Sequence, residues 1–85
     1  MENRVALIGV VVENLDSVAE LNALLHDYAD FIIGRMGIPY KKRGVSVISI
    51  AIDAPNDTIS TLSGKIGNLP GVSSKTVYAK LDSDK

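Results

Sequence analysis

The sequence contains no cysteine and no tryptophan, and its only aromatic residues are Tyr28, Phe31, Tyr40 and Tyr78. Without cysteine there can be no disulfide, no thiolate metal ligand and no cysteine nucleophile. His26 is the single histidine, so a tight transition-metal site would need ligands shared between subunits. So few aromatic rings also leave little material for stacking bases or sugars. We therefore predict no metal and no cofactor in one chain.

A strong charge of one sign is also missing. Nine basic and ten acidic residues give a net charge of −1 and a pI near 5.6, which offers no electrostatic footprint for nucleic acid. No apolar run approaches the ~20 residues of a membrane-spanning helix, and the N-terminus has no small-residue signal cleavage site. We expect a cytoplasmic protein that contacts neither nucleic acid nor membrane directly.

What the chain does contain is a regular alternation of apolar patterns. The strongest periodic signal is a helical spacing of apolar residues that predicts a first helix at about 16–31, with Asp16 or Ser17 placed to cap it. Two glycines and a proline make the second strand suitable for a sheet edge. The predicted elements are a strand at 4–12, a helix at about 16–31, a strand at 32–40, a strand at 45–52, a helix that starts within 55–58 and ends at Gly67 or Pro70-Gly71, and a strand at 72–81, followed by a frayed tail at 82–85.

This order is the split βαβ arrangement. It predicts one α+β domain over residues 1–85, with a ferredoxin-like βαββαβ fold in which two helices cover one face of a four-stranded antiparallel sheet. The two central strands are apolar on both faces. Val5, Leu7 and Val11 oppose Ala6, Ile8, Val10 and Val12, while Val45 and Val47 oppose Ile48, Ile50 and Ile52.

A face that the helices leave uncovered usually marks an interface or a ligand site. A domain this small also buries only about 60% of the surface that its unfolded chain exposes, and oligomerisation is a common remedy. We therefore predict a homo-oligomer, a dimer or tetramer, formed through the sheet face or a sheet edge.

Candidate sites are few. His26 has Asp30 one turn further along the same helix face, which permits a metal or proton site but equally a histidine at the edge of the core bonded to a carboxylate or carbonyl. Lys41-Lys42-Arg43 is most simply a solvated hairpin tip. The loop carboxylates Glu13, Asp16, Asp53 and Asp57 could support acid–base chemistry, although helix capping explains Asp16 and Asp57.

Two motif matches fail on their chemistry. Arg43-Gly44 starts a strand as in RNA-recognition domains, but Val45, Val47 and Ile50 stand where aromatic residues would stack on bases. Ser63-Gly64-Lys65 lacks the earlier glycine of a phosphate loop and lies inside a helix. Gly64 on the outward side of that helix would let a backbone or ligand approach closely, or else marks a helix that breaks early at Gly64–Gly67.

Several short segments together resemble the small regulators of the iron-only hydrogenase system. They are Leu24-Leu25-His26, Arg35-x-Gly37-x-Pro39, Asn56-Asp57-Thr58-Ile59, Leu62-Ser63-Gly64-Lys65-Ile66-Gly67 and Gly71-Val72. The resemblance implies an ACT-type domain similar to the C-terminal nickel-binding domain of the nickel-responsive regulator. That domain holds its metal with several histidines and a cysteine, whereas this chain offers His26 alone. Amino-acid-binding ACT domains commonly carry Pro-Gly in the first strand–helix loop, where this chain has Asn14-Leu15-Asp16-Ser17. Neither ligand site is therefore transferred.

We predict a non-enzymatic regulatory or ligand-sensing module that oligomerises with itself. A small molecule or protein partner would bind between subunits, with Glu13, Asn14, Asp16, Gly64 and Lys65 as candidate contacts. Because the βαββαβ unit uses the whole chain, we expect any regulation to act through a partner or a separate DNA-binding chain. The alternatives are a structural partner subunit or a small dimeric α/β-barrel enzyme, which burial of His26 in a sheet-lined cavity would favour.

Overall fold

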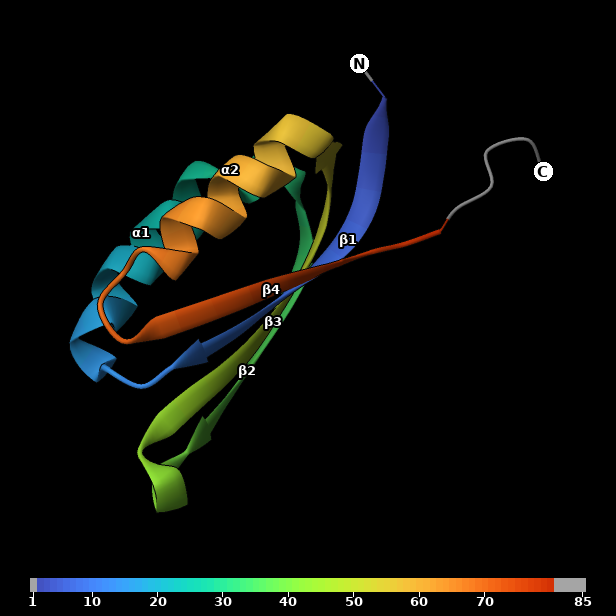
Figure 1. Cartoon of the computed structure of the whole chain (residues 1–85). Helices are drawn as coiled ribbons and strands as arrows, with labels where there is room; N and C mark the ends of the chain where they lie inside the picture. The colour runs from blue at the N-terminus through green and yellow to red at the C-terminus, as the bar shows by residue number, and fades with distance from the viewer. Residues whose placement is uncertain (1, 81–85) are drawn as a thin grey trace.

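The computed structural model describes residues 2–80, and the predicted tail at 82–85 lies outside them. The observed order of strands and helices is the predicted one (Figure 1). The elements are β1 (Asn3–Val12), η1 (Leu15–Ser17), α1 (Val18–Asp27), η2 (Ala29–Phe31), β2 (Ile32–Tyr40), η3 (Lys41–Arg43), β3 (Val45–Pro55), α2 (Asn56–Gly67) and β4 (Val72–Tyr78), where η denotes a 3-10 turn.

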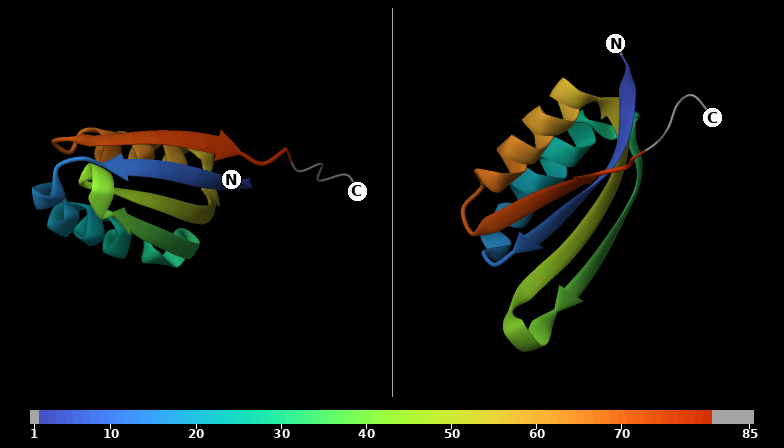
Figure 2. Two further views of the ribbon diagram at one scale, coloured as in Figure 1. Left: turned by 90° about the horizontal axis from the view of Figure 1, so that it is seen from below. Right: turned by 45° about the vertical axis from the view of Figure 1, so that its right-hand side comes forward.

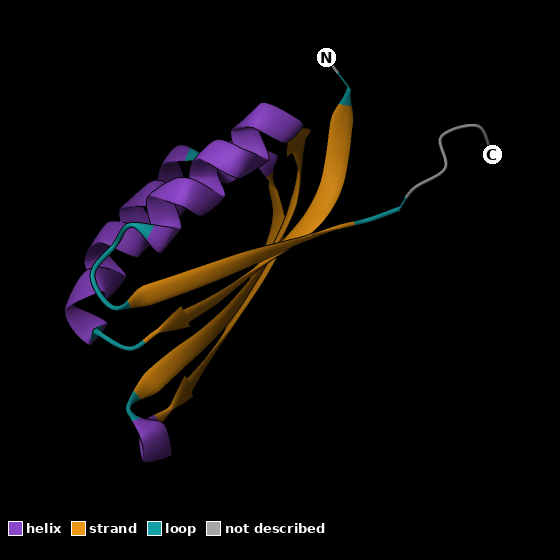
Figure 3. Ribbon diagram, viewed as in Figure 1, coloured by secondary structure: helices purple, strands orange, loops and turns teal. Residues whose placement is uncertain are grey.

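The four strands form one antiparallel sheet in the order β2-β3-β1-β4. Both helices lie on one side of this sheet, and no helix of residues 2–80 lies on its other side (Figures 1 and 3). Seen end on, the molecule is a two-layer stack of helices and sheet (Figure 2). The α+β, ferredoxin-like fold predicted from the sequence is confirmed. No helix within residues 2–80 is long and apolar enough to cross a bilayer.

The core forms between the helices and alternate residues of the two central strands. Burial along β1 and β3 follows the alternation expected from the sequence, because successive side chains of a strand point to opposite faces. Each fully buried Leu or Ile contributes about 1.5–3 kcal/mol relative to an exposed one. The buried side chains are Ala6, Ile8, Val10 and Val12 of β1, Ile48, Ile50, Ile52 and Ala54 of β3, Leu21 and Leu25 of α1, Ile59, Leu62 and Ile66 of α2, and Val72 of β4.

The first helix is shorter than predicted. Its α-helical part ends at Asp27, because Tyr28 leaves the helical region with φ −106° and ψ 16°. A 3-10 turn, η2, then directs the chain into the edge strand. Its tight geometry suits an abrupt change of direction. The β3 strand runs three residues further than predicted, since its pairing with β1 continues to Asn3 and Pro55. β4 ends at Tyr78, earlier than predicted.

Of the two residues predicted to cap the first helix, Ser17 occupies the N-cap position of α1 and Asp16 does not. Asn14 caps the preceding 3-10 turn, η1, where its side-chain oxygen accepts a hydrogen bond of 3.0 Å from the Asp16 backbone N–H. Ser17 precedes α1 but makes no capping bond, and its hydroxyl instead donates to the Pro70 carbonyl at 2.6 Å. The rules of helix capping consider only bonds within the same turn, whereas the Ser17 hydroxyl bonds to a loop that is distant in sequence.

Candidate functional site

The side of the sheet opposite the helices, called the open face here, is apolar and exposed. The register places Tyr40 beside Val45 and Ile38 beside Val47, so the bulky residues of β2 and β3 form adjacent pairs. Met36 is 63% exposed and Val77 is 67% exposed. The large apolar residues of the open face are Leu7, Val11, Met36, Ile38, Tyr40, Val47 and Val77.

Small residues occupy the middle of the open face. Gly9 of β1 pairs with Ser49 of β3, and Ala51 pairs with Leu7. Charged residues lie towards its margins, with Lys75 on the edge strand β4 and Asp53 near the end of β3. An apolar centre, a flat middle and a polar margin are features of protein–protein interfaces.

A hollow of about 440 Å³ lies at the hairpin end of the open face. Its lining residues are Val11, Glu13, Tyr40, Arg43 and Val45. The hollow therefore combines a carboxylate, a guanidinium and a phenol with an apolar wall, a set that can bind a small molecule carrying both charges. Sequence reasoning selected Glu13 but treated Arg43 as a solvated charge, because only the β1–β3 register, which pairs Val12 with Ser46, reveals that they share one hollow.

The five predicted ligand contacts are spread over different parts of the described residues 2–80. Glu13 lines the hollow on the open face, and its neighbour Asn14 packs against Gly71 in the loop before β4. Lys65 instead lines a groove of about 370 Å³ between the two helices, with its ammonium 5.5 Å from the centre of the Tyr28 ring. Gly64 faces open space on the outside of α2.

Asp16 is exposed in the turn before α1. Its backbone N–H is the group that Asn14 caps.

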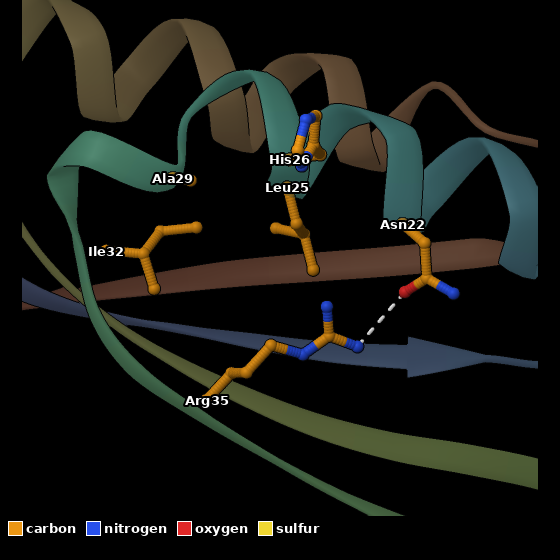
Figure 4. Close-up of a pocket in the computed structure, with 6 residues that line it drawn as sticks. All are labelled: Asn22, Leu25, His26, Ala29, Ile32 and Arg35. Carbon is orange, nitrogen blue, oxygen red and sulfur yellow. Dashed lines mark hydrogen bonds between the residues drawn. The ribbon is translucent and has the colours of Figure 1, made fainter.

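His26 lies on α1, beside a pocket of about 320 Å³ between that helix and β2 (Figure 4). The Arg35 side chain extends towards the helix and donates to the side-chain oxygen of Asn22 at 3.0 Å. The other lining residues are Leu25, Ala29 and Ile32. Within residues 2–80, no three His, Cys, Asp or Glu side chains are grouped to hold a metal ion.

The hydroxyls of Ser63, Ser74 and Thr76 form a small cluster between α2 and β4. Ser74 donates to the Ser63 carbonyl at 2.9 Å, and Thr76 donates to the Ser63 hydroxyl at 3.1 Å. No carboxylate or imidazole takes part in these bonds. The cluster attaches the edge strand to the helix above it, so its role is structural.

Two comparisons connect the chain to known proteins. The profile of a family described as "TM1266-like: Iron-only hydrogenase system regulator, putative" matches residues 4–76. The solved structure of an uncharacterised protein, TM1266 from Thermotoga maritima, is similar at 35% sequence identity with a TM-score of 0.89. That match covers 93% of this chain and 100% of the other. No curated protein matches.

The family description names a regulator and not an enzyme. It agrees with the resemblance carried by the short sequence motifs, which is thereby confirmed. The profile and the solved structure both extend over most of the chain. This chain therefore belongs to the TM1266-like family of iron-only hydrogenase system regulators.

Proposed function

We propose that this protein is a non-enzymatic regulatory module that pairs with a second copy through the open face. A small ligand or protein partner would act by changing the stability of that pair. The observation that carries the proposal is the open face itself, where residues as large as Leu7, Ile38 and Val77 are 49%, 55% and 67% exposed. Monomeric proteins rarely leave so many apolar side chains together in water.

The size of the open face supports a second copy as its occupant. Four strands about 4.8 Å apart and about 30 Å long give a projected area on the order of 600 Å². Side-chain relief raises the accessible area above that value, towards the ~800 Å² per partner of a standard interface. A twofold pair also places apolar centre on apolar centre, since both copies present the same patch.

The hollow with Glu13 and Arg43 suggests how a ligand would be sensed. It lies on the open face, so a second copy seated there would cover it or add groups to it. A ligand held between two copies binds the pair and not the separate chains, and it therefore stabilises the pair by mass action. With a net charge of −1, the module is suited to act through a partner protein and not on DNA itself.

No observation favours the alternative of a barrel-type enzyme. Burial of His26 in a cavity walled by the sheet would favour that reading. His26 is instead exposed on α1, on the side of the sheet opposite the open face.

Sedimentation velocity at micromolar concentration tests the pairing, with Ile38→Glu and Val47→Glu as the variants. The unaltered protein is expected to sediment as a dimer or larger oligomer. Each variant places a carboxylate where apolar surface would be buried, and burying an unpaired charge is strongly unfavourable, so both should sediment as monomers. Leu15→Glu is the matched control, because Leu15 is 58% exposed but lies in η1, outside the sheet.

An unaltered protein that is monomeric in this experiment would contradict the proposal. Oligomers that persist in both face variants, or that are lost equally in the Leu15 control, would place the interface elsewhere. Circular dichroism of each variant verifies that the fold is retained, as expected for substitutions at exposed positions.

A further inference from the structure

We infer that the pocket between α1 and β2 binds a small organic carboxylate that has an apolar body. This site lies on the helix side of the sheet and is separate from the open face. It includes none of the five residues predicted as ligand contacts from the sequence.

The backbone brings the polar groups together. Asn22 and His26 lie four residues apart on α1 and therefore on the same face of the helix. Arg35 pairs with the buried Ile50, so the alternation of β2 turns its side chain towards the helices. Figure 4 shows the guanidinium extending below α1, where it reaches Asn22.

The charge of the pocket selects an anion. Arg35 donates to a neutral amide oxygen, so this bond leaves its positive charge uncompensated. A guanidinium has five N–H donors in a planar fork, and most remain free to bind a second group. That fork matches the two oxygens of a carboxylate. No Asp or Glu is among the lining residues, and so no carboxylate there would pair with the ammonium group of an amino acid.

The floor of the pocket selects an apolar body over a bare anion. Leu25 is only 3% exposed and forms the base, with Ala29 and Ile32 beside it. The pocket volume of about 320 Å³ accommodates a short hydrocarbon chain as well as its head group. The His26 imidazole at the rim supplies another hydrogen-bonding group.

NMR titration of the ¹⁵N-labelled protein with 3-methylbutanoate tests the assignment. Saturable shifts are expected at the backbone amides of α1 and β2 that border the pocket. The neutral 3-methylbutanamide and inorganic phosphate serve as comparison probes, because the first lacks the charge and the second lacks the apolar body. Both should bind at least several-fold more weakly than 3-methylbutanoate.

The Arg35→Gln variant removes the charge and the fork. Its affinity for 3-methylbutanoate should fall about tenfold, since the loss of a charged hydrogen-bond donor is worth roughly that factor. Arg4→Gln is the matched control, because Arg4 lines neither this pocket nor the hollow of the open face and instead stacks on the Tyr78 ring at 4.3 Å, so the affinity should be unchanged. Arg35→Lys keeps the charge without the fork and should give an intermediate loss, which also provides a reading if the Gln variant does not fold.

The absence of saturable shifts would overturn the inference, as would equal binding of the amide or of phosphate. Equal losses of affinity in Arg35→Gln and Arg4→Gln would also overturn it, since they would indicate unspecific attraction to positive charge. None of these outcomes depends on pairing through the open face. The oligomeric state, measured separately, therefore distinguishes failure of this site from failure of the proposed function.

Discussion

At the scale of single residues, the contact between the loops before α1 and before β4 depends on Gly71. This residue has φ +68°, and its carbonyl accepts from the Glu13 backbone N–H at 2.7 Å. A Cβ atom added at Gly71 would lie 2.6 Å from the Cβ atom of Asn14. Ser17, only 2% exposed, adds its bond to Pro70 on the same side. The loop that begins at Glu13 is thereby fixed by a segment more than fifty residues away in the sequence.

Gly71→Ala should destabilise the fold by about 2–4 kcal/mol, because backbone strain of ~1–2 kcal/mol adds to the steric overlap with Asn14. Gly44→Ala is the control, since Gly44 has nearly the same φ of +67° but open space around a Cβ atom. It should lose only the ~1–2 kcal/mol of strain. Urea unfolding at one fixed protein concentration gives both values. Equal losses of unfolding free energy in the two variants would show that the overlap with Asn14 relaxes without a cost in stability.

At the scale of elements, local patterns predicted the types and order correctly, and failed at the ends. Burial alternates along β1 as its sequence does, because every second residue meets the helices. The end of α1 at Tyr28 could not be read from the apolar period, which continues past it. Helix ends are decided by the direction in which the chain must leave, and here that direction is set by the position of β2 at the sheet edge.

Gly64, inside α2, allows a test of how helix propensity affects the stability of the fold. A Cβ atom at Gly64 would meet nothing within 4 Å. Gly64→Ala should therefore raise the free energy of unfolding by about 0.5–1 kcal/mol, because alanine has the higher helix propensity. Gly67→Ala should raise the free energy of unfolding by less, since its Cβ atom would lie 3.2 Å from the Ser74 hydroxyl. Thermal unfolding of both variants makes the comparison.

A loss of stability in Gly64→Ala would contradict this expectation if the protein were monomeric. Accompanied by a loss of oligomer, it would instead reveal that another backbone approaches α2 closely at Gly64. Sedimentation of the same variant distinguishes the two results.

At the scale of the whole molecule, the two faces of the sheet differ in how much apolar surface they bury. One side is sealed by α1 and α2, while the other exposes the apolar residues of the open face (Figure 2). A small domain has little stability to spare, so the proposed pairing through that face would contribute a large fraction of the total.

If two copies share this face, the thermal midpoint of unfolding should rise with protein concentration, because only folded chains associate. Calorimetry over a hundredfold range of concentration measures the effect. Ile38→Glu should show a lower midpoint that does not vary with concentration. A concentration-independent midpoint in the unaltered protein would argue that the open face is not an interface between copies.

The sequence by itself determined the order of elements, the ferredoxin-like class and the apolar character of both faces of β1 and β3, because these follow from short-range periodicity. It also carried the family resemblance in its short motifs. Only the tertiary structure decided that Ser17 bonds to Pro70, that Arg43 joins Glu13 in one hollow, and that Arg35 reaches Asn22 under α1. Each of these contacts joins segments whose spacing in the chain carries no periodic signal. They exist because strand register and helix packing bring the segments together.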